Sequence, residues 1–366
     1  MSSKKYLLDR MVRYPREFSE TEFSELVSKQ AEEAVNFDDL RNNIRRIYDM
    51  NESALLTESD AMKSSLAKMN LKKQEKRKKK FFSRIRKGMR TTGYKTIVAE
   101  GDSWFCFPVY VKDINEWLIC DKQINLFSIA AAGDWIANMI YEGKYIEELS
   151  MIEPDVFLIS GGGNDFVGSY RLSFMINTNI DENLPDEDYV TACVSDAFYA
   201  FIWTLKAQYW LLLSSLQQAK KLKNLKIITQ GYDYVIPYPK KCRSWNPFQW
   251  LINNFTPTGD WLRTPLKLKG LHNEKKQKII MRHFIDKVNE MFISLANYPA
   301  ENGIDDKFYK FSNLYHIDCR NVAGGFEGWF DEIHLKSSKF KVVAEAYKHI
   351  IFGNPSQKII KATDFQ

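Results

Sequence analysis

The sequence Thr96-Ile-Val-Ala-Glu-Gly-Asp-Ser-Trp-Phe105 decides the fold, because an apolar run of strand length stops abruptly at Gly-Asp-Ser. Its first residues suit a buried strand, and Gly101 allows a sharp turn that leaves Ser103 just past the strand's carboxyl end. In open α/β sheets this edge is where ligands bind. A serine becomes an effective nucleophile only with a base, a group that orients the base, and donors for an oxyanion. Ser103 therefore predicts chemistry only if the rest of the chain supplies these parts.

The composition is that of a globular protein with ample material for a core. Of 366 residues, 45% are hydrophobic and 14% are aromatic. The amino terminus has no apolar stretch of signal-peptide length. The most apolar segment, residues 197–213, is interrupted by Lys206 and Gln208 and is shorter than the roughly 20 residues that a membrane span needs. We therefore expect a protein of the cytoplasm.

The cysteines and histidines predict neither a disulfide framework nor a metal site. The five cysteines are scattered and include no Cys-x-x-Cys pair, and no two of the five histidines have the spacing His-x-x-x-His. We expect neither a metal nor a cofactor.

Residues 1–93 predict a helical, basic extension. Apolar residues recur there at helical spacing in three segments, which contain Phe23, Leu26, Val27 and Ala31; Leu40, Ile44 and Ile47; and Ala61, Leu66 and Met69. Residues 72–90 carry seven lysines, four arginines and one glutamate, a net charge of +10 in a chain of net charge +6. Two interpretations stay open: the run contacts phosphates of nucleic acid or of an anionic membrane surface, or it is a solvated linker or helix face.

Residues 94–366 predict a single α/β domain. Short apolar runs predict five strands at 96–100, 124–130, 155–160, 225–230 and 314–318. Helical patterns occupy 112–120, 134–149, 187–221, 274–298 and 337–352. This alternation is typical of a parallel sheet with right-handed crossovers, so we expect a three-layer α/β/α sandwich.

An aromatic-rich insertion at about 237–275 interrupts this alternation. It contains Trp245 and Trp250 among several prolines. Long loops within a compact domain are often binding loops or lids, and these aromatics could line a pocket for an apolar or ring-bearing group beside Ser103. The alternative, that they pin the insertion to the core, stays open.

Three further motifs follow predicted strands as the serine does. Ala131-Ala-Gly-Asp134 and Gly161-Gly-Gly-Asn-Asp165 place small residues at strand ends, where a backbone N–H of Gly133 and the amide of Asn164 can approach a substrate oxygen. In Trp329-Phe-Asp-Glu-Ile-His-Leu335, Asp331 is close enough in sequence to hold His334 in one tautomer. The order of the three candidates is then Ser, Asp, His.

Together these blocks resemble the SGNH, or GDSL-type, hydrolase family. The four signature blocks match as Gly101-Asp102-Ser103, Gly133, Gly162-x-Asn164-Asp165 and Asp331-x-x-His334, over about residues 94–352. The resemblance implies a flavodoxin-like sandwich with five parallel strands that hydrolyses carboxylic esters of lipids, sugars or small alcohols without a metal or cofactor.

The same resemblance implies a role for each matched residue. Ser103 would be the nucleophile, His334 the base and Asp331 the group that orients it. The oxyanion would be held by the backbone N–H groups of Ser103 and Gly133 and by the Asn164 side chain. Trp104 stands where the family's first block has leucine, and it joins Trp245 and Trp250 as a candidate for contact with substrate.

Other classes of protein fit less well. An α/β-hydrolase would need Gly-x-Ser-x-Gly, which the chain lacks. The glycine run at 161–163 lacks the small residue of a dinucleotide-binding fingerprint, and no Walker-type motif occurs. The remaining alternative is a nucleic-acid- or membrane-binding protein that acts through residues 72–90 and carries a subsidiary or inert hydrolase-like domain. The sequence does not fix the oligomeric state.

Overall fold

The computed structural model describes residues 4–33, 60–88, 93–107, 111–219, 221–222, 224–237, 261–297 and 311–366. The predicted helical pattern through Leu40, Ile44 and Ile47 lies outside these residues, and so does the part of the aromatic insertion that contains Trp245 and Trp250.

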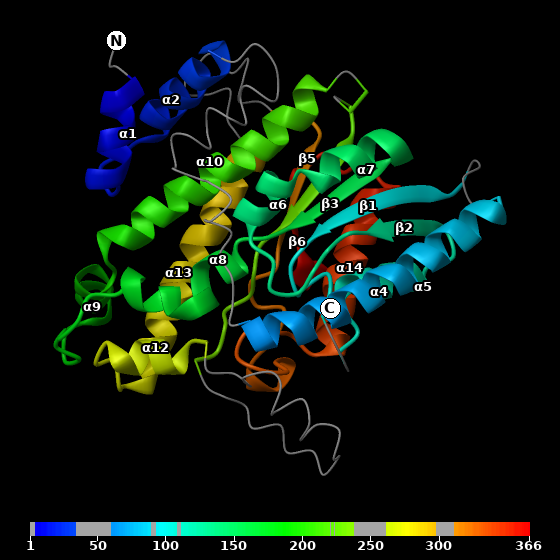
Figure 1. Cartoon of the computed structure of the whole chain (residues 1–366). Coiled ribbons are helices and arrows are strands. Elements are labelled where there is room, and N and C mark those ends of the chain that lie inside the picture. Colours follow the sequence, from blue (N-terminus) through cyan, green and yellow to red (C-terminus); the bar gives the residue numbers. More distant parts are fainter. Residues whose placement is uncertain are drawn as a thin grey trace.

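A sheet of six parallel strands forms the centre of the fold (Figure 1). The strands are β1 (Lys95–Gly101), β2 (Ile124–Ser128), β3 (Val156–Ser160), β4 (Lys226–Gln230), β5 (Leu314–Asp318) and β6 (Ile359–Lys361). Their order is β2-β1-β3-β4-β5-β6. The first five follow the flavodoxin-like order, which agrees with the predicted fold class.

The predicted number of strands, five, is wrong, because β6 adds a sixth at the edge beside β5. This strand spans only Ile359–Lys361, and only Ile360 is buried. So short a strand carries no alternation of apolar and polar residues for a sequence pattern to detect. The five predicted strands all occur, with ends shifted by no more than two residues.

Helices cover both faces of the sheet and give the predicted three layers (Figure 1). One face is covered by α6 (Ile136–Glu142), α7 (Lys144–Ile152), α10 (Asp196–Gln218) and α13 (Glu274–Ala296). The other is covered by α5 (Ile114–Cys120) and α14 (Ser337–Phe352). The remaining helices are α1 (Lys4–Arg13), α2 (Glu20–Glu33), α4 (Asp60–Arg86), α8 (Gly163–Val167), α9 (Asp186–Cys193) and α12 (Arg263–Leu268), with short 3-10 helices at η2 (Gly168–Met175), η5 (Phe326–Gly328) and η6 (Ala362–Phe365).

Two predicted helices are each divided into two. The segment 134–149 forms α6 and α7, which meet at Gly143, a residue with φ of 67° that ends the first helix in the left-handed conformation. The segment 187–221 forms α9 and α10, which are separated by Val194 and Ser195.

The most apolar helix, α10, is buried in the molecule and also receives the amino-terminal helices. Trp203 packs edge to face on Phe18 and stacks on Phe23, with ring centroids 5.1 and 5.5 Å apart. Lys206, almost fully buried, pairs with Glu20 at the start of α2. Among the described residues, none of the helices has the length and apolarity that crossing a membrane requires.

Candidate active site

Ser103 lies in the turn that follows β1, at the carboxyl edge of the sheet. The Asp102 N–H donates to the Ser160 carbonyl of β3 at 3.0 Å, so the turn stays in register with the neighbouring strand. A Cβ atom on Gly101 would lie 2.7 Å from the same Ser160 oxygen, which explains the need for glycine here. The turn therefore fixes Ser103 at the predicted strand end, with 9% of its surface exposed.

His334 and Asp331 come together with Ser103 from the far end of the chain. His334 Nε2 lies 2.7 Å from Ser103 Oγ, and His334 Nδ1 lies 2.8 Å from Asp331 Oδ2. Because a carboxylate only accepts hydrogen bonds, Nδ1 carries the ring proton and Nε2 is left free to accept the Ser103 hydroxyl proton. The three predicted residues thus form one hydrogen-bonded line.

The loop that carries His334 is braced by its own backbone. Trp329 and Leu335 form an antiparallel bridge across its base. Oδ1 of Asp331 accepts the backbone N–H groups of Ile333 at 2.9 Å and of His334 at 2.8 Å. Asp331 therefore holds the turn with Oδ1 and makes its shorter contact with the imidazole through Oδ2, while Oδ1 also lies 3.0 Å from Nδ1.

Aromatic rings enclose the imidazole. The ring of Phe107 lies edge to face with His334 at a centroid distance of 4.7 Å, and that of Trp261 does so at 5.9 Å. Only 6% of His334 is exposed. The hydrogen bonds of this histidine are thus shielded from water, which strengthens them.

Asp102 supports the serine turn without touching His334. Its Oδ2 accepts the Tyr232 hydroxyl at 2.6 Å, and its Oδ1 accepts the Trp104 N–H at 3.0 Å and the Ser160 hydroxyl at 3.1 Å. Burial raises the pKa of this carboxyl, although the three donors oppose the rise. No sequence motif indicated Tyr232, whose hydroxyl also accepts the Gly163 N–H at 3.0 Å.

The two predicted oxyanion residues other than Ser103 lie on neighbouring loops. Asn164 lines the same pocket as Ser103, and its Nδ2 donates to the Asp134 carbonyl at 2.8 Å. Gly133, which has φ of 81°, is the residue just before Asp134 and is not among those that line the pocket. Within the part of the chain that the structure describes, the N–H groups of Ser103 and Gly133 donate to no protein acceptor. Both are therefore free to bind an oxyanion that reaches them.

A pocket opens beside Ser103 and Asn164. Its volume is about 490 Å³ if the part open to solvent is included. Apart from the turn and glycine-loop residues, its wall is made of Trp104, Phe166, Val167, Tyr232, Val235, Ile285, Val288 and Ile333. Trp104, predicted to contact substrate, is part of this wall, whereas Trp245 and Trp250 lie outside the described residues. The sequence did not indicate Ile285 and Val288, which lie on α13 and read there as ordinary core positions of an amphipathic helix.

Acidic side chains lie behind the oxyanion loops. Burial raises the pKa of Asp165 to about 6, although its carboxylate accepts the Ile136 N–H at 3.0 Å. Burial also raises the pKa of Asp134 to about 7 and that of Glu100 well above its usual range. The described residues include no cluster of three or more histidine, cysteine or acidic side chains that could hold a metal ion.

Comparison with protein-family models gives no match, and comparison with curated proteins gives none either. Among solved structures, the chain is similar to a catalytic mutant of an acetylxylan esterase from Geobacillus stearothermophilus, with 12% identity and a TM-score of 0.36 over 72% of this chain and 97% of that one. It is similar to an extracellular lipase from Streptomyces rimosus, with 15% identity and a TM-score of 0.37 over 67% of this chain and 94% of that one. A lipase/acylhydrolase from Enterococcus faecalis shares 14% identity and a TM-score of 0.33 over 72% of this chain and 99% of that one.

These structures are esterases and lipases, the class of enzyme that the sequence motifs predict. At identities and TM-scores this low the likeness carries no argument of its own. Any function for the chain must therefore follow from the side chains around Ser103.

Proposed function

We propose that the protein is a serine hydrolase that cleaves carboxylic esters through Ser103, His334 and Asp331. The observation that carries the proposal is the continuous line of hydrogen bonds from Ser103 Oγ through the imidazole of His334 to the Asp331 carboxylate. A hydroxyl, a base and an orienting carboxylate in this order form the machinery of acyl transfer. The line ends at a pocket, so an ester can reach the hydroxyl.

Each step of the reaction uses groups of this chain and water. Ser103 Oγ attacks the ester carbonyl carbon while His334 Nε2 takes the hydroxyl proton, and Asp331 stabilises the resulting imidazolium. The negative oxygen of the tetrahedral intermediate is held by the N–H groups of Ser103 and Gly133 and by the Asn164 amide. The intermediate collapses, the C–O bond to the alcohol breaks, and His334 returns the proton to the leaving alcohol.

The second half of the reaction releases the acid. A water molecule attacks the acyl-enzyme carbonyl, and His334 removes its proton as it did from Ser103. Collapse of the second intermediate breaks the bond to Oγ, and His334 returns its proton to Oγ, which regenerates the serine hydroxyl and the neutral imidazole. The wall of the pocket is apolar at Phe166, Ile285 and Val288, so we expect the acyl group to be an alkyl chain or a ring.

The proposed activity can be tested with p-nitrophenyl acetate, assayed with the wild-type protein and with Ser103→Ala. We expect the substitution to lower kcat by several orders of magnitude, because the nucleophile is lost. Asn164→Ala should lower kcat by about 10² to 10³, the usual effect of removing one oxyanion donor. Equal turnover by the wild type and Ser103→Ala would rule out hydrolysis at this serine.

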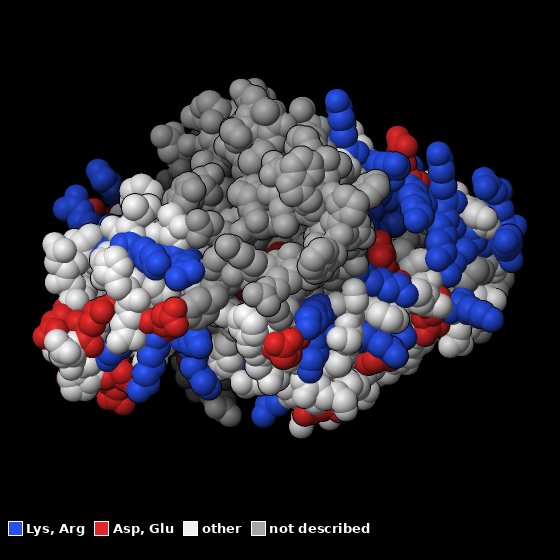
Figure 2. Space-filling view, turned by 90° about the horizontal axis from the view of Figure 1, so that it is seen from below, with Lys and Arg blue, Asp and Glu red and all other residues white. Residues whose placement is uncertain are grey.

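A second candidate function is binding to an anionic surface through α4. Seven exposed cations lie between residues 72 and 87, along α4 and just past its end, namely Lys72, Lys76, Lys78, Lys79, Lys80, Arg86 and Lys87. Figure 2 shows Lys and Arg side chains gathered on the right of the face in view, the side toward which α4 extends in Figure 1. Two apolar side chains, Leu71 and Phe82, are also exposed, by 59% and 39%.

This second function is tested separately from hydrolysis. Binding to vesicles with and without phosphatidylserine, and to duplex DNA, is measured over a series of salt concentrations. If α4 contacts phosphates, affinity falls steeply as salt rises, and reversing the charge of Lys76 and Lys79 weakens it. Affinity that does not depend on salt would exclude the phosphate contacts. Cell fractionation tests the predicted cytoplasmic location.

A further inference from the structure

The inner side of α4 is bonded to the two loops that carry Ser103 and Gly133. This helix lies alongside β2, at the edge of the sheet (Figure 1). Five polar side chains of α4 donate to backbone carbonyls of the body of the protein, namely Asn70, Lys73, Gln74, Arg77 and Arg84. Four of the five reach residues 105–107, just after Ser103, or residues 129–132, just before Gly133.

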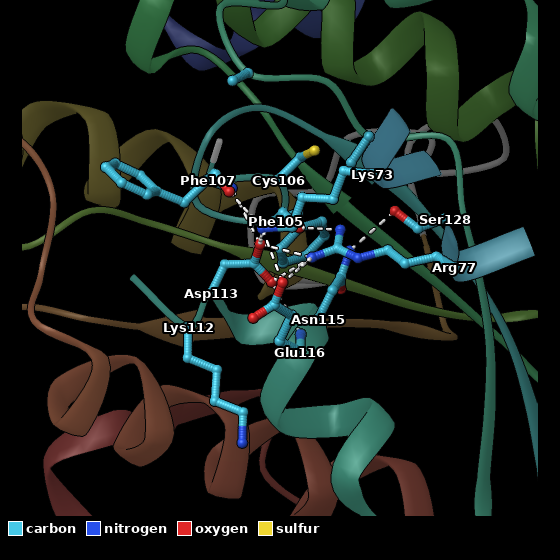
Figure 3. Close-up of polar contacts among 12 residues, drawn as sticks. Lys73, Arg77, Phe105, Cys106, Phe107, Lys112, Asp113, Asn115, Glu116 and Ser128 are labelled. Carbon is cyan, nitrogen blue, oxygen red and sulfur yellow. Dashed lines mark hydrogen bonds and ion pairs between the residues drawn. The ribbon is translucent and has the colours of Figure 1, made fainter. Parts of the chain in front are cut away.

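The contact between α4 and the loop that follows Ser103, residues 105–107, is centred on Asp113, a fully buried residue that precedes α5. Figure 3 shows Lys73 and Arg77 converging on its carboxylate. Arg77 reaches both carboxylate oxygens, at 2.6 and 2.7 Å, and Lys73 reaches one of them at 2.7 Å. Arg77 also donates to the Phe105 carbonyl at 2.7 Å, while the Asp113 carboxylate accepts the Phe107 N–H at 3.0 Å. Phe107 is the residue whose ring packs on His334.

The contact with the second loop is made by Asn70. Its Nδ2 donates to the Ala132 carbonyl at 3.0 Å, and its Oδ1 accepts the Ala132 N–H at 3.1 Å. One side-chain amide thus binds both polar groups of the residue just before Gly133. Leu66, one helical turn earlier, lies 3.2 Å from where a Cβ of Gly133 would be. On the other side of Gly133, the Asp134 carbonyl is bonded to Asn164.

The chemistry of this inner side is unusual for a helix that serves only to stabilise the fold. A helix packed for stability presents an apolar stripe, and most of its free energy comes from burying that stripe. Among the side chains of α4 that the structure describes, residues 66–86, only Phe81 is both apolar and buried, and the other inward positions are mostly polar. Hydrogen bonds add direction and fix distances, which a catalytic loop needs and a core contact does not.

We propose that α4 is a positioning element of the active site, and that Asn70 is the residue that sets the N–H of Gly133 for the oxyanion. The proposal rests on the proposed serine hydrolysis and extends it to residues 60–86, which lie outside the resemblance to the hydrolase family. With Asn70 in place, Gly133 is held from both neighbours, by Asn70 at Ala132 and by Asn164 at Asp134. Without Asn70, the loop that contains Gly133 loses the hydrogen bonds at Ala132 and is held only at Asp134.

The test compares three variants with the wild type: Asn70→Ala, Asn70→Asp and, as a matched control at an exposed position of the same helix, Lys68→Ala. Asn70→Asp keeps the shape and the acceptor for the Ala132 N–H, so it guards against a variant that fails to fold. The concentration of competent sites is measured for each by titration with a fluorophosphonate. The readouts are kcat and KM for p-nitrophenyl acetate, and the Ki of a boronic acid, which becomes tetrahedral on Ser103.

For Asn70→Ala we expect kcat per competent site to fall about 10- to 100-fold, because the misplaced donor acts mainly in the transition state, while KM stays within about twofold. The Ki of the boronic acid should rise by the same factor as kcat falls. Asn70→Asp should fall between the wild type and Asn70→Ala, and Lys68→Ala should match the wild type.

Two results would overturn the role of Asn70 while leaving hydrolysis intact. One is a kcat per competent site equal to that of the wild type, which would reduce Asn70 to a structural residue. The other is an unchanged Ki for the boronic acid. A wild type that neither hydrolyses the ester nor reacts with the fluorophosphonate would instead refute the proposed function, and the positioning role would fall with it.

Discussion

Replacing Asp331 with asparagine separates the two tasks of this side chain. Oδ1 of Asp331 accepts two backbone N–H groups, and Oδ2 lies 2.8 Å from His334 Nδ1. Asparagine has one carbonyl oxygen, which the two N–H groups hold in the place of Oδ1. Its NH2 group is then turned toward the imidazole. The retained oxygen lies 3.0 Å from Nδ1, but the shorter contact, at 2.8 Å, is now made by an amide nitrogen that only donates. This contact favours Nδ1 as the acceptor and moves the ring proton to Nε2. His334 then cannot accept the Ser103 proton.

The expected loss for Asp331→Asn is large in catalysis and small in stability. In Ser-His-Asp hydrolases the same change lowers kcat about 10⁴-fold, which is ~5 kcal/mol in the activation barrier. The turn keeps both of its N–H bonds, so the free energy of unfolding should change by less than about 1 kcal/mol. Asp331→Ala is the matched comparison: it should lose catalysis similarly and should also lose about 1 to 3 kcal/mol of stability, because two N–H groups lose their acceptor.

The assay combines steady-state hydrolysis of p-nitrophenyl acetate with urea unfolding of the three proteins. An Asp331→Asn variant that keeps more than about a tenth of the wild-type kcat would refute this account of the histidine tautomer. So would equal stability of Asp331→Asn and Asp331→Ala combined with equal activity, because the backbone bonds of Oδ1 would then have no effect.

Three further predictions concern stability, pH and specificity. Asp113→Ala removes the buried partner of Arg77 and leaves it only the more exposed Glu116 at 3.7 Å, so urea unfolding should show a loss of about 3 kcal/mol, and a loss below about 1 kcal/mol would contradict the buried pair. Because the pKa of Asp134 is raised to about 7, the folded state binds its proton more tightly than the unfolded state, and this contribution to stability is lost as the pH rises from about 4 through 7. Asp134→Asn should therefore gain about 2 kcal/mol relative to the wild type between pH 4 and pH 8, a value that allows for its partial exposure, and a pH-independent difference in thermal unfolding would contradict this. Val288→Trp fills the pocket, so the ratio of kcat/KM for p-nitrophenyl octanoate to that for the acetate should fall about tenfold or more, and an unchanged ratio would remove this wall from the acyl site.

The layers of the fold followed from features that are local in sequence. Runs such as Ile97-Val-Ala99 lack polar residues because they are buried on both faces of a parallel sheet. Such continuous apolar runs allowed the strands to be predicted from the sequence. Ser103 and Asn164 were found because each follows a strand within a few residues, and parallel strands bring their carboxyl ends to one edge. Residues that follow different strands in the sequence therefore meet at one edge of the sheet and can form a site. His334 lies well beyond the end of β5 and was found through its spacing from Asp331.

What the sequence did not reveal depends on contacts between distant segments. The sequence alone does not separate the inner side of α4 from the rest of the basic run. Lys73, Arg77 and Arg84 are basic residues like the exposed lysines beside them. Only their spacing places them on one side of the helix. Tyr232 has no neighbouring motif, and its role follows from its bond to Asp102 across 130 positions of sequence.

The most direct test of the central claim is to locate the residue that a fluorophosphonate modifies. The wild-type protein and His334→Ala are treated with the reagent, digested and mapped by mass spectrometry. The geometry predicts a single phosphonyl adduct on Ser103 of the wild type and little or none on His334→Ala, since the serine would lack its base. An unmodified Ser103 in folded wild-type protein, or equal labelling with and without His334, would contradict the account.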